Sequence, residues 1–307
     1  MRRAGNSGGK MAGDKSGRSG ILLVLTAGVS WGLLGIFVRG LADFGLSTAD
    51  IASLRSCGAA LVLCVSFALM RPRAYAVKLR HLWCMAGCGI LSITCFNICY
   101  FETLRHTTVN IAVVLLYTAP AFVMVMAALF FGERLTLRKI AAAAAVLLGC
   151  VLIGGVFSSG GALSRSVLLW GLGSGFCYAL YTVFGRCAQN RGYDSCAITL
   201  WTFIFSGSAG IFLLDWRTAV RAASSGGPHF WILLAGLVPV STILPYCAYT
   251  AGLKRLTSST SAITATVEPL AGTLVGIFVF HEKLTAEAVA GMVLILGAVL
   301  FCREKNG

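Results

Sequence analysis

The segment His281-Glu-Lys-Leu-Thr285 follows an apolar run that contains Pro269, and a nearly identical arrangement occurs 149 residues earlier. There, Gly132-Glu-Arg-Leu-Thr136 follows an apolar run that contains Pro120. Such self-similarity at a fixed offset indicates an internal repeat. Two further pairs extend it: Tyr249-Thr-Ala-Gly-Leu253 with Tyr100-Phe-Glu-Thr-Leu104, and, at a nearly equal offset, Cys177-Tyr-Ala-Leu-Tyr-Thr-Val-Phe-Gly-Arg186 with Ser30-Trp-Gly-Leu-Leu-Gly-Ile-Phe-Val-Arg39.

The composition is that of a membrane protein. Of the 307 residues, 57% are hydrophobic and 12% are charged, whereas soluble proteins carry about 25% charged residues. A helix that crosses a bilayer needs about 20 mostly apolar residues, and the hydropathy of the chain predicts ten such segments with short connections. These segments are about 21–40, 49–70, 81–102, 108–131, 138–157, 167–187, 196–214, 229–251, 257–280 and 287–302.

Each repeat unit holds five of these segments. Because five is odd, the second unit must enter the membrane in the opposite orientation to the first. The sequence therefore predicts an all-α membrane protein of ten transmembrane helices, built as two inverted five-helix repeats over 21–157 and 167–302. A duplication that merely enlarges a helix bundle is the alternative. Residues 1–20, rich in Gly, Ser, Lys and Arg, are predicted to be a disordered cytoplasmic tail, and 303–307 a short cytoplasmic tail.

The basic residues predict the orientation. Eighteen of the 25 Lys and Arg residues fall in the termini and loops of one side, six fall on the other side, and Arg55 lies inside a span. Cytoplasmic loops retain positive charge, so both termini are predicted to be cytoplasmic. The net charge of +14 then reflects topology, and no nucleic acid is expected as a partner. The twelve cysteines lie within apolar runs and are interpreted as reduced packing residues.

Three helix starts carry capping signals. Ser47, followed three residues later by Asp50, predicts a capping box at the start of the second span. Thr136 and Thr285 are expected to cap the fifth and tenth spans in a similar way.

The sequence resembles a known family in four features: two five-span halves, Arg55 in the second span, a proline in the fourth and ninth spans, and the Glu-Arg-Leu-Thr and Glu-Lys-Leu-Thr turns. They are similar to EamA-type members of the drug/metabolite transporter (DMT) superfamily. The resemblance covers about 21–302 and is most specific from Val267-Glu-Pro-Leu-Ala-Gly272 to Glu282-Lys-Leu-Thr285. It implies a ten-helix inner-membrane carrier with a central cavity, usually an exporter of amino acids or other small metabolites. His281 departs from the glycine that is common at its position.

Charged residues inside the predicted spans are the first candidates for function, because a charge at the bilayer centre costs at least about 2.5 to 3.5 kcal/mol. Glu268 is predicted about 16 Å into the ninth span, near the midplane, and Arg55 lies near the outer part of the second span. They could hold the carboxylate and the amine of an amino acid, or they could pair with each other. Glu268 is also a candidate cation or proton site. Arg39 and Glu102 lie near span ends, where a long side chain can reach the membrane surface and its charge costs little free energy.

A polar stripe leads to Glu268. Thr257, Ser261 and Thr264 precede it by eleven, seven and four residues, which places all four on one helical face. We interpret this stripe as one wall of a transport pathway. The alternative is that these hydroxyls bond to their own helix backbone and pack against neighbouring helices.

Prolines and aromatic residues complete the candidate site. Pro120 and Pro269 each remove a backbone donor from a span, and we interpret them as hinges, with plain kinks as the alternative. Tyrosines at span ends are often interfacial anchors, but some at matching repeat positions could face one cavity. The candidate binding side chains besides the charged and stripe residues are Trp31, Asn97, Tyr100, Tyr117, Tyr178, Tyr181, Tyr246 and Tyr249.

A metal site and an active site are the competing interpretations. One face of the third span carries His81, Cys84, Cys88, Cys95 and Cys99. Such soft ligands suit copper or zinc. However, the first and last cysteines are about 22 Å apart along a helix, so one ion cannot use them all, and no resident metal or other cofactor is expected. The sequence has no Ser-His-Asp order, metalloprotease motif or phosphate loop, so catalytic residues are not expected.

The sequence therefore predicts a secondary active transporter of the bacterial cytoplasmic (inner) membrane, which exports a small amino acid-like metabolite by alternating access. Drugs, quaternary amines, sugars and soft metals are the alternative cargoes, and a membrane-embedded enzyme is the alternative class. The expected partners are a small-molecule substrate, the lipid bilayer and protons as a coupling ion, with the chain acting as a monomer or homodimer.

Overall fold

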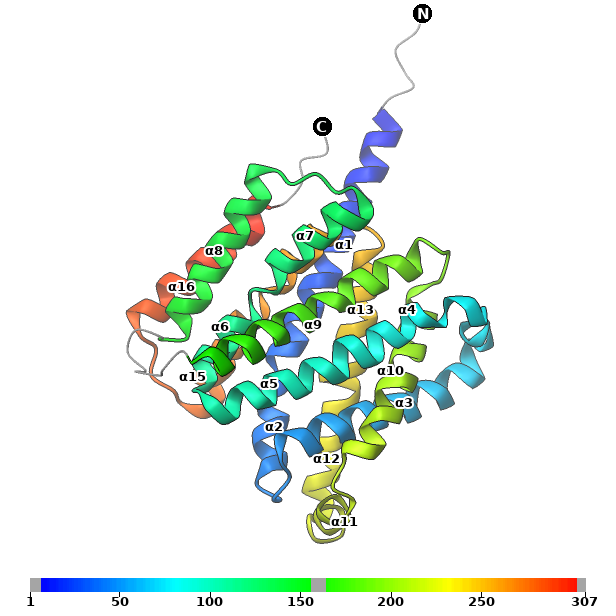
Figure 1. Cartoon of the computed structure of the whole chain (residues 1–307), viewed down its shortest axis with the longest axis vertical. Coiled ribbons are helices and arrows are strands. Elements are labelled where there is room, and N and C mark those ends of the chain that lie inside the picture. The colour runs from blue at the N-terminus through cyan, green and yellow to red at the C-terminus, as the bar shows by residue number, and fades with distance from the viewer. Residues whose placement is uncertain (1–6, 156–163, 303–307) are drawn as a thin grey trace, which may run out of the picture.

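Helices make up the fold throughout the part of the chain that the structure describes. The computed structural model describes residues 7–155 and 164–302, with side chains from residue 17 onward, and within these ranges it contains no strand (Figure 1). Most of the elements are α-helices, η1 and η2 are 3₁₀ turns, and η3 and η4 are wider π turns. The elements are α1 (Ser7–Gly32), α2 (Leu34–Ala42), α3 (Thr48–Met70), η1 (Pro72–Tyr75), η2 (Leu79–His81), α4 (Leu82–Ala86), η3 (Gly87–Thr94), α5 (Cys95–His106), α6 (Val109–Leu116), α7 (Ala119–Phe131), α8 (Leu137–Ile153), α9 (Arg165–Gln189), α10 (Ser195–Leu213), α11 (Trp216–Ser225), α12 (Gly227–Val238), η4 (Pro239–Ile243), α13 (Leu244–Leu253), α14 (Ser258–Ala265), α15 (Glu268–Phe280) and α16 (Ala286–Phe301).

Each of the ten predicted apolar segments coincides with a helix or with a run of successive helices. The chain is thus a multi-pass membrane protein. α8 and α16, with 17 and 16 residues, reach only about 25 Å, less than the roughly 30 Å hydrocarbon core. The eight helical runs that are long and apolar enough to cross a membrane are Gly17–Ala42, Thr48–Met70, Leu79–His106, Val109–Phe131, Arg165–Gln189, Ser195–Leu213, Gly227–Leu253 and Ser258–Phe280.

The three capping predictions are confirmed. Ser47 Oγ accepts the backbone N–H of Asp50, and the Asp50 carboxylate accepts the backbone N–H of Ser47, each at 3.1 Å. The side chains of Thr136 and Thr285 each accept the backbone N–H three residues later. These bonds satisfy amides that a helix start leaves without an intrahelical partner.

The structure differs from the predicted disordered tail over residues 7–20. This stretch belongs to α1, which begins at Ser7 and continues into the first apolar segment. No proline interrupts it, and at its end Gly20 packs closely against Arg255 and Leu256. The predicted tail residues 1–6 and 303–307 lie outside the described residues, as does the connection 156–163.

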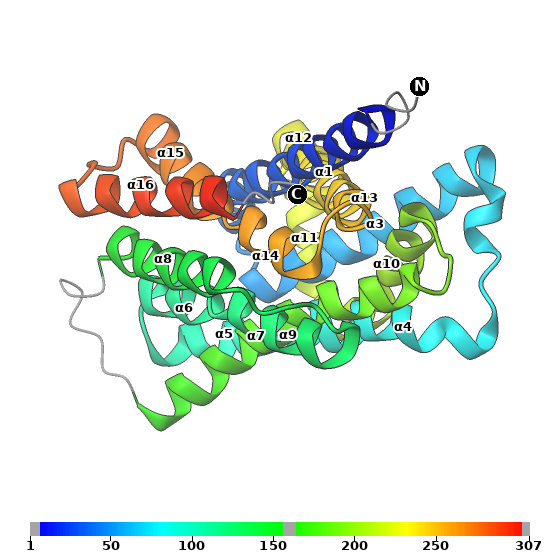
Figure 2. The ribbon, with the colours of Figure 1, turned by 90° about the horizontal axis from the view of Figure 1, so that it is seen from above.

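The main helix contacts join elements that are far apart in the sequence. α8 and α16 lie side by side, as Figures 1 and 2 both show. Seen from above, α1, α12, α13, α15 and α16 lie on one side and α5, α6, α7, α8 and α9 on the other (Figure 2). The closest helix pairs are α8 with α16, α3 with α10, α1 with α13, and α5 with α9.

α3 and α10 run antiparallel. Near the start of α3, the Asp50 carboxylate accepts the backbone N–H of Asp215 at 2.9 Å, just after the end of α10. One and a half turns further along α3, Ser56 accepts a hydrogen bond from Ser206 at 3.1 Å. Residue numbers thus rise along one helix while they fall along the other, and Gly207 allows the two backbones to approach closely.

Two helical runs are interrupted just before the prolines that the sequence analysis singled out. α6 and α7 are separated at Tyr117 and Thr118, and α14 and α15 at Thr266 and Val267. At each break the backbone tightens into i to i+3 turns, such as the bond from the Thr118 N–H to Leu115 O at 3.2 Å. A proline cannot donate the next helical hydrogen bond, which accounts for the position of both breaks.

Two wide turns, which the sequence analysis did not predict, occur in the third and eighth apolar segments. In η3, Thr94 Oγ1 donates to Gly89 O at 3.0 Å, and in η4, Thr242 Oγ1 donates to Leu237 O at the same distance. Both bonds reach back five residues, and the two threonines lie 148 residues apart. The repeat is therefore visible in local backbone geometry as well as in motifs.

Candidate functional site

A cavity of about 550 Å³ lies between α1, α2, α3, α5, α6 and α15. Arg39, Thr48 and Glu282 line it at one end of the bundle, where their side chains are exposed. We call this end the mouth end. The residues from the sequence prediction that line the cavity are Trp31, Arg55, Asn97, Tyr100, Tyr117, Glu268 and Pro269.

Arg55 lies on α3 and is only 6% exposed. Its guanidinium makes no hydrogen bond or ion pair with any residue that the structure describes, and its Nε is fully buried. Within the same residues, no ion pair joins Arg55 to Glu268, so the two charges face one cavity without neutralising each other directly. A buried charge without a hydrogen-bond partner is costly, so an anionic group that reached Arg55 would be stabilised there.

Glu268 is the first residue of α15, directly after the break in the ninth apolar segment. The hydroxyl of Tyr178 donates a hydrogen bond to its Oε2 at 3.2 Å. The partial positive charge at the start of α15 also favours a carboxylate at this position. The break thus places an acid on the cavity wall with one carboxylate oxygen held by a protein donor.

Aromatic rings back the inner part of the cavity. The edge of Trp31 meets Tyr246 and Tyr178, with ring centroids 5.2 and 6.4 Å apart, and its ring tilts against Tyr249 at 5.6 Å. Of these four residues, only Trp31 reaches the cavity surface. Trp31 is therefore held in place by a layer of tyrosines.

Tyr181 and Tyr249 belong to this supporting layer. The hydroxyl of Tyr181 bonds to Thr250 at 2.8 Å, and that of Tyr249 bonds to Thr182 at 2.6 Å. Neither tyrosine lines the 550 Å³ cavity. The structure thus groups Tyr178, Tyr181 and Tyr249 behind the cavity wall.

The stripe residues Ser261 and Thr264 are buried and lie outside this cavity. Ser261 Oγ donates to the Thr257 carbonyl at 3.0 Å, which is the backbone bonding that the alternative interpretation of the stripe describes. Pro120 also lies outside the cavity, whereas Pro269 lines it.

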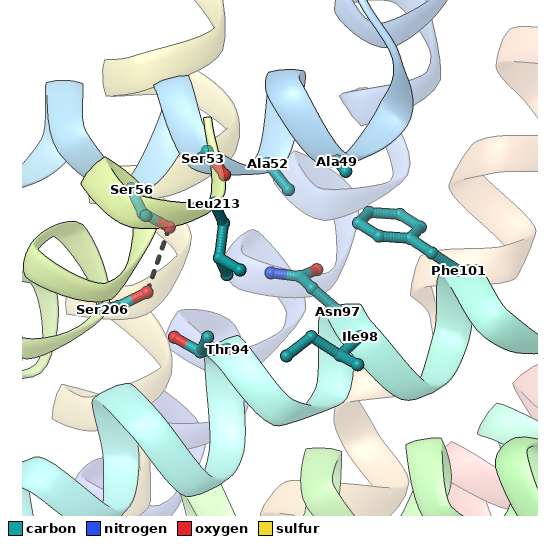
Figure 3. A pocket seen from close by; sticks show the side chains of 11 residues that line it. Ala49, Ala52, Ser53, Ser56, Thr94, Asn97, Ile98, Phe101, Ser206 and Leu213 are labelled. Atoms are coloured by element: carbon teal, nitrogen blue, oxygen red, sulfur yellow. Dashed lines mark hydrogen bonds between the residues drawn. The ribbon is translucent and has the colours of Figure 1, made fainter. Parts of the chain in front are cut away.

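A side pocket of about 100 Å³ adjoins the cavity between α3, α5 and α10. Asn97 lines both spaces, and Figure 3 shows its amide extending from α5 toward α3, between Leu213 and Phe101. The Ser56–Ser206 hydrogen bond closes the far end of this pocket (Figure 3). Asn97 could therefore present either amide atom to a molecule in the larger cavity.

Sequence reasoning missed several residues of the cavity wall. Phe96, Phe101 and Phe280 line it, but phenylalanine is common in membrane helices and gave no signal. Gly272 and Gly276 line it as well. Their spacing of four residues is typical of close helix contacts, an interpretation that did not identify them as part of a cavity wall.

The opposite end of the bundle, which we call the closed end, is held by the carboxylate of Glu133. Its Oε1 accepts the backbone N–H of Ser258 at 2.6 Å, and its Oε2 accepts the N–H and hydroxyl of Ser259 at 3.2 and 2.8 Å. Burial raises the pKa of Glu133, but these hydrogen bonds outweigh it and hold the pKa below the ordinary value of 4.5. The first amides of α14 are thus capped by an ionised side chain from another segment.

Two basic residues complete the closed end. Lys139 Nζ lies 3.9 Å from Glu133 Oε2. Arg186 donates to the carbonyl of Leu256 and, at 3.1 Å, to the hydroxyl of Ser258. The first two amides of α14 therefore bind one carboxylate, and the carbonyl of Leu256 in the turn before α14 binds one guanidinium.

The family model described as EamA-like transporter family matches the chain twice, over residues 18–155 and 165–303. The chain belongs to the EamA-like transporter family. This confirms the resemblance to the DMT superfamily and shows that the chain is of a membrane transporter family.

Relatives of this EamA-like chain are named as transporters. It is 28% identical to an uncharacterized transporter of Archaeoglobus fulgidus over 92% of this chain and 96% of that one. It is 24% identical to a probable terminal-alkyne amino-acid exporter of Streptantibioticus cattleyicolor, over 93% of each chain. A crystal structure with 16% sequence identity superposes with a TM-score of 0.72, covering 92% of this chain and 96% of the other, and supports the fold.

Proposed function

We propose that this protein is a secondary active transporter that exports a small amino acid-like metabolite by alternating access. The observation that carries the proposal is the pair of opposite charges, Arg55 and Glu268, on the wall of one membrane cavity. A zwitterion placed between them would meet a buried cation at its carboxylate and an acid at its amine. The name of the Streptantibioticus relative as an amino-acid exporter supports the same class of cargo.

We propose ten transmembrane helices in two inverted repeats. Contacts between the halves come in matched pairs: Gly28 of α1 packs against Val267, and Gly175 of α9 packs against Thr118. Gly175 follows Gly28 by 147 residues, and Val267 follows Thr118 by 149. In both pairs the helix runs parallel to its partner, as expected if a two-fold axis relates the halves.

The antiparallel packing of α3 and α10 supports the inversion. These helices occupy the second position of each five-helix unit, so the proposed axis must map one onto the other. An axis along the membrane normal would leave equivalent helices parallel, whereas an axis in the membrane plane reverses them. The hydrogen bonds Asp50–Asp215 and Ser56–Ser206 join the two helices in antiparallel order, which supports the axis in the membrane plane.

The distribution of Lys and Arg supports an inner-membrane orientation with both termini in the cytoplasm. The closed end then faces the cytoplasm, since it carries the loop that contains Glu133 and Arg134. The mouth end faces outward. The structure would correspond to the state of an exporter that has just opened its cavity to the outside.

Counterflow of labelled amino acids in proteoliposomes tests the function. We expect saturable exchange of one amino acid class by the wild type, at least a hundredfold less exchange for Arg55→Gln, and partial recovery for Arg55→Lys, which keeps the charge but not the planar fork. Arg105→Gln is the matched control, because Arg105 is exposed at the same end of the bundle and pairs only with Glu102 among the described residues. Exchange that survives Arg55→Gln contradicts the proposed site. No exchange of any amino acid would contradict the cargo class and direct the panel to amines, sugars and metals.

Proton coupling through Glu268 is a further part of the proposal. The coupling proton and the substrate amine would compete for the carboxylate, so binding of one would release the other. A Glu268→Gln variant should still bind substrate weakly but lose uptake driven by a pH gradient. If the variant keeps full gradient-driven transport, Glu268 is not the coupling site.

Topology mapping tests the inversion. Reporter fusions at the two termini and within 156–163 should place the termini on the cytoplasmic side and the connection between the repeats outside. Termini and connection on one side of the membrane would contradict the inverted arrangement.

A further inference from the structure

Glu282 and the start of α6 occupy the repeat positions that match Glu133 and the start of α14, which close the opposite end. Glu282 lies 149 residues after Glu133, and Val109 and Asn110 lie 149 residues before Ser258 and Ser259. At the closed end the carboxylate binds the first amides of α14. At the mouth end α6 has no side-chain cap, and Val109 is 60% exposed.

The turns that carry the two glutamates have the same backbone. Gly132 and His281 both adopt the left-handed conformation, with φ of 65° and 56°. After each of them, the glutamate N–H bonds to a carbonyl six residues earlier, at 3.2 Å for Glu133 and 3.0 Å for Glu282. Equivalent turns aim the two carboxylates in equivalent directions relative to their own repeats.

In the present state Glu282 pairs with Arg39 at 2.7 Å, and both side chains are more than half exposed. An exposed ion pair of this kind stabilises little, so the carboxylate can be given up at small cost. Glu282, Arg39 and Val109 all line the same cavity. The acid and the uncapped amides therefore share one opening.

We propose that Glu282 is the latch of the mouth end. When the mouth closes, its carboxylate leaves Arg39 and accepts hydrogen bonds from the Val109 and Asn110 amides at the start of α6. The inference rests on the proposed alternating access between inverted repeats. A helix start suits this role because its free amides and dipole favour a carboxylate, as Glu133 on α14 shows in this molecule.

The same correspondence gives Arg39 a partner in the closed mouth. Arg186, its counterpart in the second half, donates to the carbonyl of Leu256, and the residue 149 positions before Leu256 is Thr107. Arg39 released by Glu282 would thus bind the Thr107 carbonyl. The position that matches Lys139 holds Ala288, so the mouth latch lacks one cation and should be the weaker of the two.

Hydrogen–deuterium exchange of the full chain in lipid nanodiscs tests the latch, with peptides that cover 107–112 and 256–261. Glu133→Gln removes the charge that holds the closed end. We expect exchange at Ser259 to rise at least tenfold and exchange at Asn110 to fall at least tenfold, because the population with a closed mouth grows. Adding Glu282→Gln should cancel the slowing at Asn110. Adding Glu287→Gln, an exposed acid at the same end, should leave it intact.

The latch is overturned if Asn110 exchanges at the wild-type rate while Ser259 has become faster, or if the slowing survives Glu282→Gln. Val109→Pro provides a test that leaves the closed end untouched. It removes one of the two amides at the first helical position, where proline is tolerated, and the preceding Thr108 is already extended with ψ of 155°. Transport should fall at least tenfold, whereas Val109→Ala, which shortens the same side chain but keeps the amide, should retain it. Normal turnover of Val109→Pro would contradict the latch.

Wild-type counterflow separates the latch from the proposed function. Transport without the expected exchange responses removes the latch alone. The expected responses without transport of any substrate tested remove the proposed function and leave the latch standing.

Discussion

The closed end and the mouth end are made of equivalent parts in different arrangements. The Glu133 side chain is 12% exposed and accepts three hydrogen bonds around the start of α14. The Glu282 side chain is 51% exposed and is held by Arg39. The difference is one of arrangement rather than of parts: under the proposed latch, either end is closed by moving one carboxylate between a surface cation and a helix start, without any new structural element.

The largest difference between the ends should appear when their arginines are removed. Arg186→Gln should lower the free energy of unfolding by about 3 kcal/mol, because hydrogen bonds from a charged donor to a carbonyl and a hydroxyl are lost. Arg39→Gln should lower it by only about 1 kcal/mol, since an exposed ion pair with Glu282 and the contact of the guanidinium with the Phe280 ring are lost. Thermal unfolding in detergent measures both. Equal losses would show that the two ends are held equally tightly.

A second prediction concerns the close helix packing that the two halves share. Gly28→Ala would place a Cβ 2.5 Å from Val267, and Gly175→Ala would place one 2.5 Å from Thr118. Each change should cost about 2 kcal/mol through overpacking. Gly297→Ala is the matched control, because a Cβ there meets nothing within 4 Å and should stabilise α16 slightly. Clearly unequal costs at Gly28 and Gly175 would argue against equivalent packing in the halves.

The carboxylate of Glu133 makes the closed end sensitive to acid. Its pKa is held below 4.5, so its stabilisation is present above that value and is lost as the pH falls through the lowered pKa. At pH 7, Glu133→Gln should cost about 1 to 2 kcal/mol through weaker hydrogen bonds. The melting-temperature difference from wild type should shrink as the sample is acidified toward pH 3. A difference that is constant with pH would mean that the charge of Glu133 is not what closes this end.

The smallest effect is expected at the left-handed turns. His281 is the one non-glycine residue with positive φ among those described, where the matching residue is Gly132. His281→Gly should therefore stabilise the protein by about 0.5 kcal/mol, and Gly132→Ala should destabilise it by about 1 kcal/mol. Melting curves would detect the opposite signs, and a stabilising Gly132→Ala would contradict the shared turn geometry.

Much of the fold could be predicted because its signals are local. Apolar segment length located the helices, Ser47 with Asp50 marked a helix start, and Pro120 and Pro269 marked the two breaks. The helical residues 7–20 escaped prediction because composition alone does not report that α1 continues and that Gly20 packs against Arg255 and Leu256.

The site was predictable where chemistry is rare in a membrane. Arg55 and Glu268 stood out because charges are costly there, and both line the cavity. Among the aromatic candidates, Trp31 lines the cavity and Tyr181 supports the wall from behind. Tertiary packing, rather than residue type, decides which side chains face a cavity. Arg39 was given little weight because a charge near a span end costs little, and Glu282 was noted only as part of the repeated motif. Only the comparison of the two ends gives them a role.

The closed end also bears on how such a protein tolerates mutation. Two of the three hydrogen bonds to Glu133 come from main-chain amides, at Ser258 and Ser259, and every residue except proline offers the same amide. A scan that replaces side chains one at a time would find the acid and the Ser259 hydroxyl but overlook the two amides. The sequence at the start of α14 can therefore change while the two amide hydrogen bonds are preserved, and this part of the contact would leave little trace in the residues that lineages keep.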